Sequence, residues 1–167
     1  THKFLVRSIL GPTLAWIQHN LSSVFVPSKL PEFKANFELA LTFVSNLEEE
    51  HFTFEDELAY FRGHAAWGAF MKRWSLHQYF QIQVRQLLQP LETSLAKSID
   101  IVPEPKLFEQ TVLTVNTLKQ FWSPSSLVIP LIPKVLKISL QILRRFILFC
   151  NDDSYSIIAN PSTLSLF

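Results

Sequence analysis

Apolar residues at alternating steps of three and four recur along this chain, and they constrain its fold more than any other feature. The clearest run starts at Leu76 and continues through Phe80, Val84, Leu87, Leu91 and Leu95. This spacing places the side chains on one face of an α-helix, where they can be buried together. The sequence therefore predicts a long amphipathic helix from Leu76, with a kink or an early end at Pro90.

Two stripes of the same kind precede this helix. One consists of Leu10, Leu14, Ile17, Leu21 and Val24, and the other of Phe33, Phe37, Ala40, Val44 and Leu47. Pro27 ends the first segment, and Ser28 can cap the second. Gly11-Pro12 marks either the start of the first helix or a kink after an earlier turn from Phe4. The short loop between the two segments predicts an antiparallel helix pair.

The segment between the second stripe and Leu76 carries helix start and stop signals. Glu48-Glu49-Glu50 is an unfavourable helix end, because acids oppose the helix dipole at a C-terminus, so this run is either a poor terminus or a solvated loop. Thr53 and the acids after it are typical of a helix start. Gly63 is expected to interrupt that helix. Trp67, Phe70 and Trp74 then share one helical face.

The second half of the chain is punctuated by prolines. Residues 99–105 contain two of them and are expected to form a flexible linker. The β-branched run 111–115 could be a strand when read alone, but the surrounding pattern up to Phe121 favours a helix. Ser123-Pro124 is a good cap followed by a first helical residue. A last helix is predicted from Pro133 to Phe149, stopped by the Asn-Asp-Asp run 151–153, and residues 155–167 show no clear period.

Composition supports one all-α domain. Hydrophobic residues make up 48% and charged residues 17% of the chain, with only three glycines. We therefore expect residues 1–167 to form a single helical-bundle domain that is part of a longer protein and contacts partners through apolar surface. A net charge of +1 gives no basis for nucleic-acid binding. The single cysteine, Cys150, indicates no disulfide framework and is read as a structural thiol.

Signals for catalysis or cofactor binding are weak, and we predict no catalytic residue, no cofactor-binding residue and no metal ligand. The chain lacks a G-x-S-x-G nucleophile motif. Glu48-x-x-His51 matches half of a di-iron bundle site, which needs a second such pair and further carboxylates. A helical metal-binding module using Glu48 and His51 is the alternative that this pattern leaves open.

The apolar run from Leu127 to Phe149 raises a membrane alternative. Its four cations, Lys134, Lys137, Arg144 and Arg145, would each cost about 2.5–3.5 kcal/mol at a bilayer centre. That cost matches or exceeds the gain from the apolar residues, so a buried bundle helix is favoured over a span. A membrane-associating helix on the bilayer surface is the remaining alternative.

Two short motifs resemble one known family. The first is Phe70-Met71-Lys72-Arg73-Trp74 with Leu76 and Tyr79-Phe80-Gln81-Ile82. The second is Phe121-Trp122-Ser123-Pro124 with Ile129-Pro130-Leu131 and Leu140-Gln141-Ile142-Leu143. Both resemble motifs of the second subunits of the conserved oligomeric Golgi (COG) complex, in their later, non-N-terminal region. His77 and Gln83 depart from the proline and the basic residue that the family pattern leads us to expect.

The resemblance implies an elongated antiparallel helical bundle of the helical-rod type found in multisubunit tethering complexes. It implies a non-enzymatic, structural role in vesicle tethering, intra-Golgi retrograde transport and Golgi organisation. The implied partners are the other COG subunits and vesicle-trafficking factors, with indirect or peripheral membrane contact at the cytosolic face of the Golgi. The residues that carry the resemblance, and that we expect to form the core of the two motifs, are Phe70, Trp74, Leu76, Tyr79, Phe80, Phe121 and Trp122.

Overall fold

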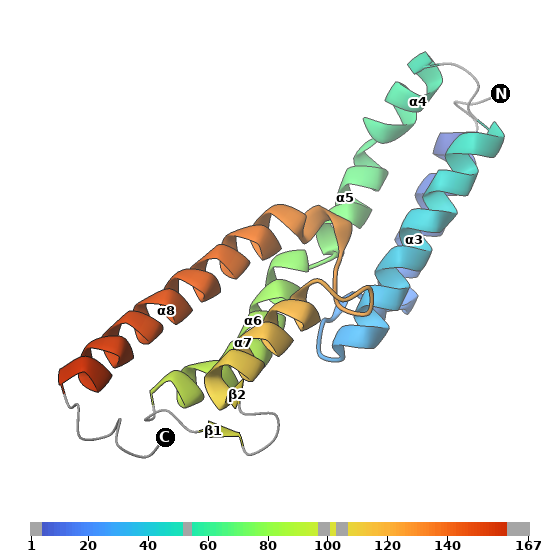
Figure 1. The fold of residues 1–167 in the computed structure, drawn as a ribbon. Coiled ribbons are helices and arrows are strands. Elements are labelled where there is room, and N and C mark those ends of the chain that lie inside the picture. Colours follow the sequence, from blue (N-terminus) through green and yellow to red (C-terminus); the bar gives the residue numbers. More distant parts are fainter. Residues whose placement is uncertain (1–4, 52–54, 97–100, 103–106, 160–167) are drawn as a thin grey trace. The chain divides into compact units, whose positions relative to one another are not determined.

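A computed structural model describes residues 5–51, 55–96, 101–102 and 107–159. Nearly all of these residues are helical, which confirms the all-α class (Figure 1). The chain divides into two compact units, Thr1–Ile82 and Gln83–Phe167, and each is described by itself. The helix α6 (Leu76–Leu95) begins in the first unit and continues into the second. The rod-like form and the single domain 1–167 stay predictions.

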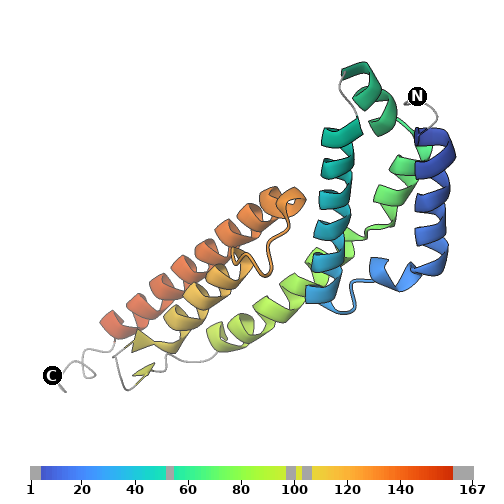
Figure 2. The ribbon, with the colours of Figure 1, turned by 90° about the vertical axis from the view of Figure 1, so that its right-hand side faces the viewer.

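The first unit contains three helices whose directions alternate along the chain, so that the first and the last of them run the same way (Figure 2). They are α2 (Gly11–Asn20), α3 (Leu30–His51) and α5 (Ala65–Arg73), with the short helix α4 (Glu55–Arg62) between the last two. A π-helical turn, Leu5–Leu10, precedes α2, and a 3-10 turn, Ser22–Phe25, connects α2 to α3. The helices α2 and α3 are antiparallel as predicted, but α2 packs chiefly against α5.

The first apolar stripe is shorter than predicted. The helix α2 ends at Asn20, whose side-chain amide donates to the carbonyl of Trp16 at 2.9 Å. Leu21, expected to face inward, is exposed. Asparagine and serine compete for backbone hydrogen bonds and weaken a helix, so the Asn-Leu-Ser-Ser run ends this one. The 3-10 turn that follows directs Phe25 into the core of the unit.

The helix α3 continues through the three acids to His51, so the loop alternative for this run is not realised. Arg62 at the end of α4 binds Glu48 through two parallel hydrogen bonds, Nε to Oε1 and Nη2 to Oε2, each 2.9 Å. This cation offsets the unfavourable charge of the acids at the helix end. The predicted interruption at Gly63 is confirmed, since α4 ends at Arg62 and α5 begins at Ala65.

Gly68 is expected to be a site where alanine stabilises the fold. It lies inside α5, and a Cβ built there meets no atom within 4 Å. Gly68→Ala should therefore raise the free energy of unfolding by about 0.5–1 kcal/mol, because alanine loses less backbone entropy on folding. Gly63→Ala is the matched control, since its Cβ would lie 3.2 Å from the carbonyl oxygen of Ala59. Urea unfolding followed by circular dichroism would show equal effects at both positions if the inference is wrong.

The second unit consists of the later part of α6, α7 (Glu109–Phe121) and α8 (Ile132–Ala159), which alternate in direction (Figure 1). The helix α7 confirms the helical interpretation of the β-branched run. Two short strands, β1 (Ile101–Val102) and β2 (Leu107–Phe108), pair antiparallel before it and were not predicted. Much of the expected linker 99–105 lies outside the described residues.

The helix α6 passes through Pro90 and ends at Leu95, the last residue of the predicted stripe, so the early end is not realised and the kink stays a prediction. Two other predicted helix boundaries in this half are wrong. Ser123 starts a single turn, accepting from the amides of Ser126 at 2.9 Å and Leu127 at 2.8 Å, and no helix begins there. The helix α8 passes through the run 151–153 and ends at Ala159, because asparagine and aspartate cost a helix only a few tenths of a kcal/mol each, about 0.5–0.7.

Candidate interaction surface

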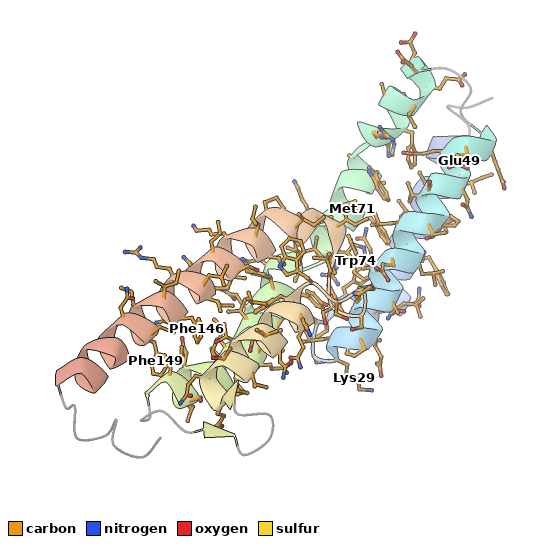
Figure 3. The ribbon with its side chains drawn as sticks, viewed as in Figure 1. Lys29, Glu49, Met71, Trp74, Phe146 and Phe149 are labelled. Atoms are coloured by element: carbon orange, nitrogen blue, oxygen red, sulfur yellow. The ribbon has the colours of Figure 1, made fainter. Side chains whose placement is uncertain are left out.

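The family motif around Trp74 folds into a closed aromatic corner in the first unit. Trp74 follows α5 in an extended conformation, with φ −73° and ψ 100°, and is buried. Figure 3 shows it where α5 meets α6, opposite α3. Four phenylalanine rings surround the indole at centroid distances of 4.7 to 6.1 Å: Phe25, Phe33, Phe37 and Phe70. The indole is therefore packed against aromatic side chains from α3, α5 and the 3-10 turn before α3.

Sequence reasoning missed Phe25, which makes the shortest of these contacts. The guanidinium of Arg73 also lies over the Phe25 ring in a cation–π contact, with Cζ 5.6 Å from the ring centroid. A signal was present in the apolar triplet Val24-Phe25-Val26 before Pro27, but the helical stripe obscured it. Phe80, which we expected beside Trp74, is half-buried on α6.

Trp74 also carries a buried donor. Its indole Nε1 has no hydrogen-bond partner in the described part of the chain. An unpaired buried N–H costs free energy, and the surrounding phenylalanine rings supply no strong acceptor. The tryptophan is therefore held in the corner by the burial and packing of its ring.

Tyr79 lies beside the aromatic corner, next to Phe33. It is almost fully buried and stacks on Phe33, with ring centroids 5.3 Å apart and planes 21° apart. Burial of the phenol, with a further contribution from the Glu38 carboxylate, raises the pKa of Tyr79 to about 12. Glu38 itself forms an ion pair with the buried Lys34. The phenol thus stays protonated at neutral pH and its role is structural.

Tyr79 should make this fold sensitive to alkali. In the unfolded chain the phenol ionises near its ordinary value of 10.0, and in the folded chain near 12. The stabilisation is complete below pH 10 and is lost as the pH rises through 12, because only the unfolded state releases the proton in that window. We expect a loss of about 1–2 kcal/mol between pH 9.5 and 11.5. Urea titrations at both pH values measure it.

Tyr79→Phe is the control for this pH dependence, since it keeps the ring and removes the ionisable group. The informative quantity is the difference in the free energy of unfolding between the two proteins at each pH, because it isolates the contribution of the Tyr79 phenol. An equal loss of stability in Tyr79→Phe would contradict the assignment.

The remaining motif residues are divided between the units. Leu76 is half-buried in the first. In the second, Phe121 is fully buried at the end of α7, and its neighbour Trp122 is 41% exposed. The indole N–H of Trp122 donates to Ser139 Oγ on α8 at 3.0 Å, and that hydroxyl donates to the carbonyl of Val135. Trp122 thus lies along α8, at the edge of the core.

Glu48, one of the two residues of the possible metal half-site, forms an ion pair with Arg62. Both carboxylate oxygens of Glu48 bind Arg62, and this pairing raises the pKa of the guanidinium. The side chain of His51 lies outside the described part of the structure. Among the residues that are described, no group of three or more histidine, cysteine, aspartate or glutamate side chains could hold a metal ion.

The second unit contains an open apolar groove between α6 and α8, with a volume of about 480 Å³. Leucines from α6 and isoleucines from α8 line it, including Leu91, Leu95, Ile138 and Ile142. An ion pair between Glu92 and Arg145 spans the two helices. Such a groove can accept an apolar side chain, and the polar residues that line it are Glu92, Gln141, Arg144 and Arg145.

Exposed apolar side chains are concentrated on α8 and the turn before it. The large ones are Ile129, Ile132, Leu136, Leu140, Leu143, Ile147 and Leu148. Over the described ranges, no helix combines the length and apolar character needed to cross a membrane. A contiguous apolar surface of this kind is typical of a protein interface.

Comparison with known proteins identifies the lineage. The chain is 28% identical over 163 residues to conserved oligomeric Golgi complex subunit 2 of Homo sapiens, covering 96% of this chain and 22% of the relative. It is 26% identical over 151 residues to the subunit of the same name from Arabidopsis thaliana, covering 86% of this chain and 20% of the relative. The chain thus spans about a fifth of the length of these relatives. No solved structure shows a significant match.

A family model described as the C-terminal part of COG2, a COG complex component, matches residues 72–164. The match covers all of α6, α7 and α8, and it begins within the first of the two motifs, two residues before Trp74. It therefore rests on the helices that carry both the groove and the exposed apolar surface. The chain belongs to the COG2 C-terminal family of COG complex components.

Proposed function

We propose that this chain is the C-terminal helical region of a second COG subunit and acts by protein–protein contact in a Golgi vesicle-tethering complex. The observation that carries the proposal is the family match over residues 72–164. Both named relatives are subunits of this complex. The role is structural and non-enzymatic, supporting intra-Golgi retrograde transport and Golgi organisation at the cytosolic face of the membrane. The partners are other COG subunits and vesicle-trafficking factors.

The structure supports such a role through its surface. A structural subunit needs a rigid core and apolar area left for partners. The aromatic corner supplies the first, and the exposed face of α8 supplies the second. The alternative of a helical metal site loses support because Arg62 binds both oxygens of Glu48.

Co-purification tests the proposal. The full-length protein that contains this chain is tagged, expressed in cells depleted of their own second COG subunit, and isolated under mild conditions. We expect the other COG subunits to copurify in fixed proportion and the tagged protein to localise to the Golgi. A protein that sediments alone and shows no Golgi localisation would contradict the assignment.

A further inference from the structure

The helix α8 has a second apolar stripe that the bundle does not cover. It starts in the turn before α8 and consists of Ile129, Ile132, Leu136, Leu140, Leu143 and Ile147, which are between 37 and 76% exposed. We call these six residues the outer stripe. Successive members are three or four residues apart, so they follow one seam along the helix.

The outer stripe is not needed to hold α8 in its own unit. A separate set of α8 residues, with Val135 and Ile142 among them, is buried on the neighbouring face, about 100° away around the helix. One such stripe suffices to dock a helix on its neighbours. Leaving a second one in water is unfavourable and promotes aggregation unless a partner covers it. From Leu136 the stripe continues through Leu140, Leu143 and Ile147, which is the spacing of the a and d positions of a coiled coil, so the shape that fits it is another helix.

The charges beside the outer stripe define the partner further. Lys137 follows Leu136 and Arg144 follows Leu143, so the two cations occupy equivalent positions one heptad apart along the same flank. Both are exposed. Neither forms an ion pair with a described residue, and residues 132–151 contain no aspartate or glutamate. Positions that flank an a/d seam select the charge of the partner helix, and here they select acids.

The other flank of the outer stripe is formed by Trp122. Its hydrogen bond to Ser139 holds the half-exposed indole against α8, where Leu136 and Leu143 are the same-face neighbours of Ser139. A rigid tryptophan at the edge of an apolar seam is a common anchor of protein interfaces. The seam is therefore bounded by an aromatic ring on one side and by cations on the other.

We propose that the outer stripe of α8 binds an α-helix of another protein, one with an apolar 3-4 stripe flanked by aspartate or glutamate. This inference deepens the proposed function and rests on it in assigning α8 to protein–protein contact.

A second copy of this chain fits the seam poorly. In an antiparallel pair Lys137 and Arg144 would face the same cations, and in a parallel pair they would face the flank with Ser139 and Phe146. Neither arrangement supplies an acid. A bilayer also fits less well, because α7 occupies one side of α8 and leaves only a narrow stripe for insertion.

Peptide binding tests the proposal on the 167-residue chain. The probes are two fluorescent synthetic helices of four heptads with leucine at a and d, one with glutamate and one with lysine at all flanking e and g positions. We expect the glutamate helix to bind about tenfold tighter than the lysine helix, with a difference that shrinks at high salt. The double variant Lys137→Glu, Arg144→Glu should reverse this order.

Single substitutions locate the site. Leu140→Glu, at the centre of the outer stripe, should lower the affinity for the glutamate helix at least about 30-fold. Leu39→Glu is the matched control, since Leu39 is an exposed leucine on α3, and it should change nothing. Circular dichroism melts confirm that each variant remains folded, which is expected because both leucines are exposed.

Four results of the peptide-binding and ultracentrifuge experiments would overturn the proposal. These are equal affinity for the two helices, no binding of either at 1 mM, loss of binding in Leu39→Glu alone, and stripe-dependent self-association in the ultracentrifuge. A vesicle experiment adds one more such result. If the chain binds phosphatidylcholine–phosphatidylserine vesicles but not the glutamate helix, and Leu140→Glu abolishes the vesicle binding, then the outer stripe binds a membrane surface and the proposal is rejected. None of these results affects co-purification of the full-length protein with other COG subunits, so failure of this inference and failure of the proposed function are distinguishable.

Discussion

Trp74→Ala is expected to lower the free energy of unfolding of the first unit by about 3–5 kcal/mol. The indole is buried among four phenylalanine rings from three different elements, so alanine would leave a cavity that no single element can close. The variant also removes the unpaired indole N–H, which offsets a small part of the loss. Urea unfolding followed by circular dichroism measures the change.

Trp16→Ala provides the matched control for this change. Trp16 lies on α2 in the same unit but is 59% exposed, so the same substitution should cost less than about 0.5 kcal/mol. A loss below about 1 kcal/mol in Trp74→Ala would mean that the corner is open or that its rings repack freely. Equal effects in the two variants would contradict the burial described for Trp74.

Phe121→Ala is expected to have a similarly large effect in the second unit, about 3–5 kcal/mol. Phe121 is fully buried at the C-terminal end of α7, which packs along α8. Its neighbour Trp122 provides a control from the same motif. Trp122→Ala should cost only about 1 kcal/mol, because the ring is half-exposed and loses one hydrogen bond, to Ser139.

The contrast between these adjacent residues separates two roles within one motif. If Trp122→Ala destabilises the unit as much as Phe121→Ala, then Trp122 is a core residue and its part in the proposed partner surface is withdrawn. If instead it leaves stability nearly intact and weakens binding of the glutamate helix, the indole acts at the surface. Stability and binding are therefore measured on the same preparations.

Strong local signals predicted the helices correctly. The stripe from Leu76 specifies α6, the glycine at 63 separates α4 from α5, and the surrounding pattern identified α7 as a helix despite its β-branched run. Helix boundaries were predicted less well. A proline at position 90 and the Asn-Asp-Asp run 151–153 reduce helix propensity, yet packing and continuity keep both helices intact.

Sequence reasoning predicted some residues of the candidate sites and missed others, because only some of them belong to a regular helical pattern. Sequence reasoning from periodicity and the family motif predicted that Phe70, Trp74, Tyr79 and Phe80 form an aromatic core. The first three are buried in the first unit, and Phe80 is half-buried. Periodicity could not identify Phe25, because the ring arrives through a 3-10 turn that breaks the helical period. Nor could it pair Glu48 with Arg62, which are fourteen residues apart and meet only because α4 folds back along the end of α3.

The sequence by itself determined that this chain is helical, where most of its helices begin, and which family it belongs to, because these depend on local spacing and short motifs. Only the tertiary structure decided which side of α8 is buried. That helix carries apolar residues on two sides, and periodicity cannot distinguish them. The side containing Val135 and Ile142 lies inward because the neighbouring helices cover it, and the side containing Leu136 and Leu140 is left exposed for a partner.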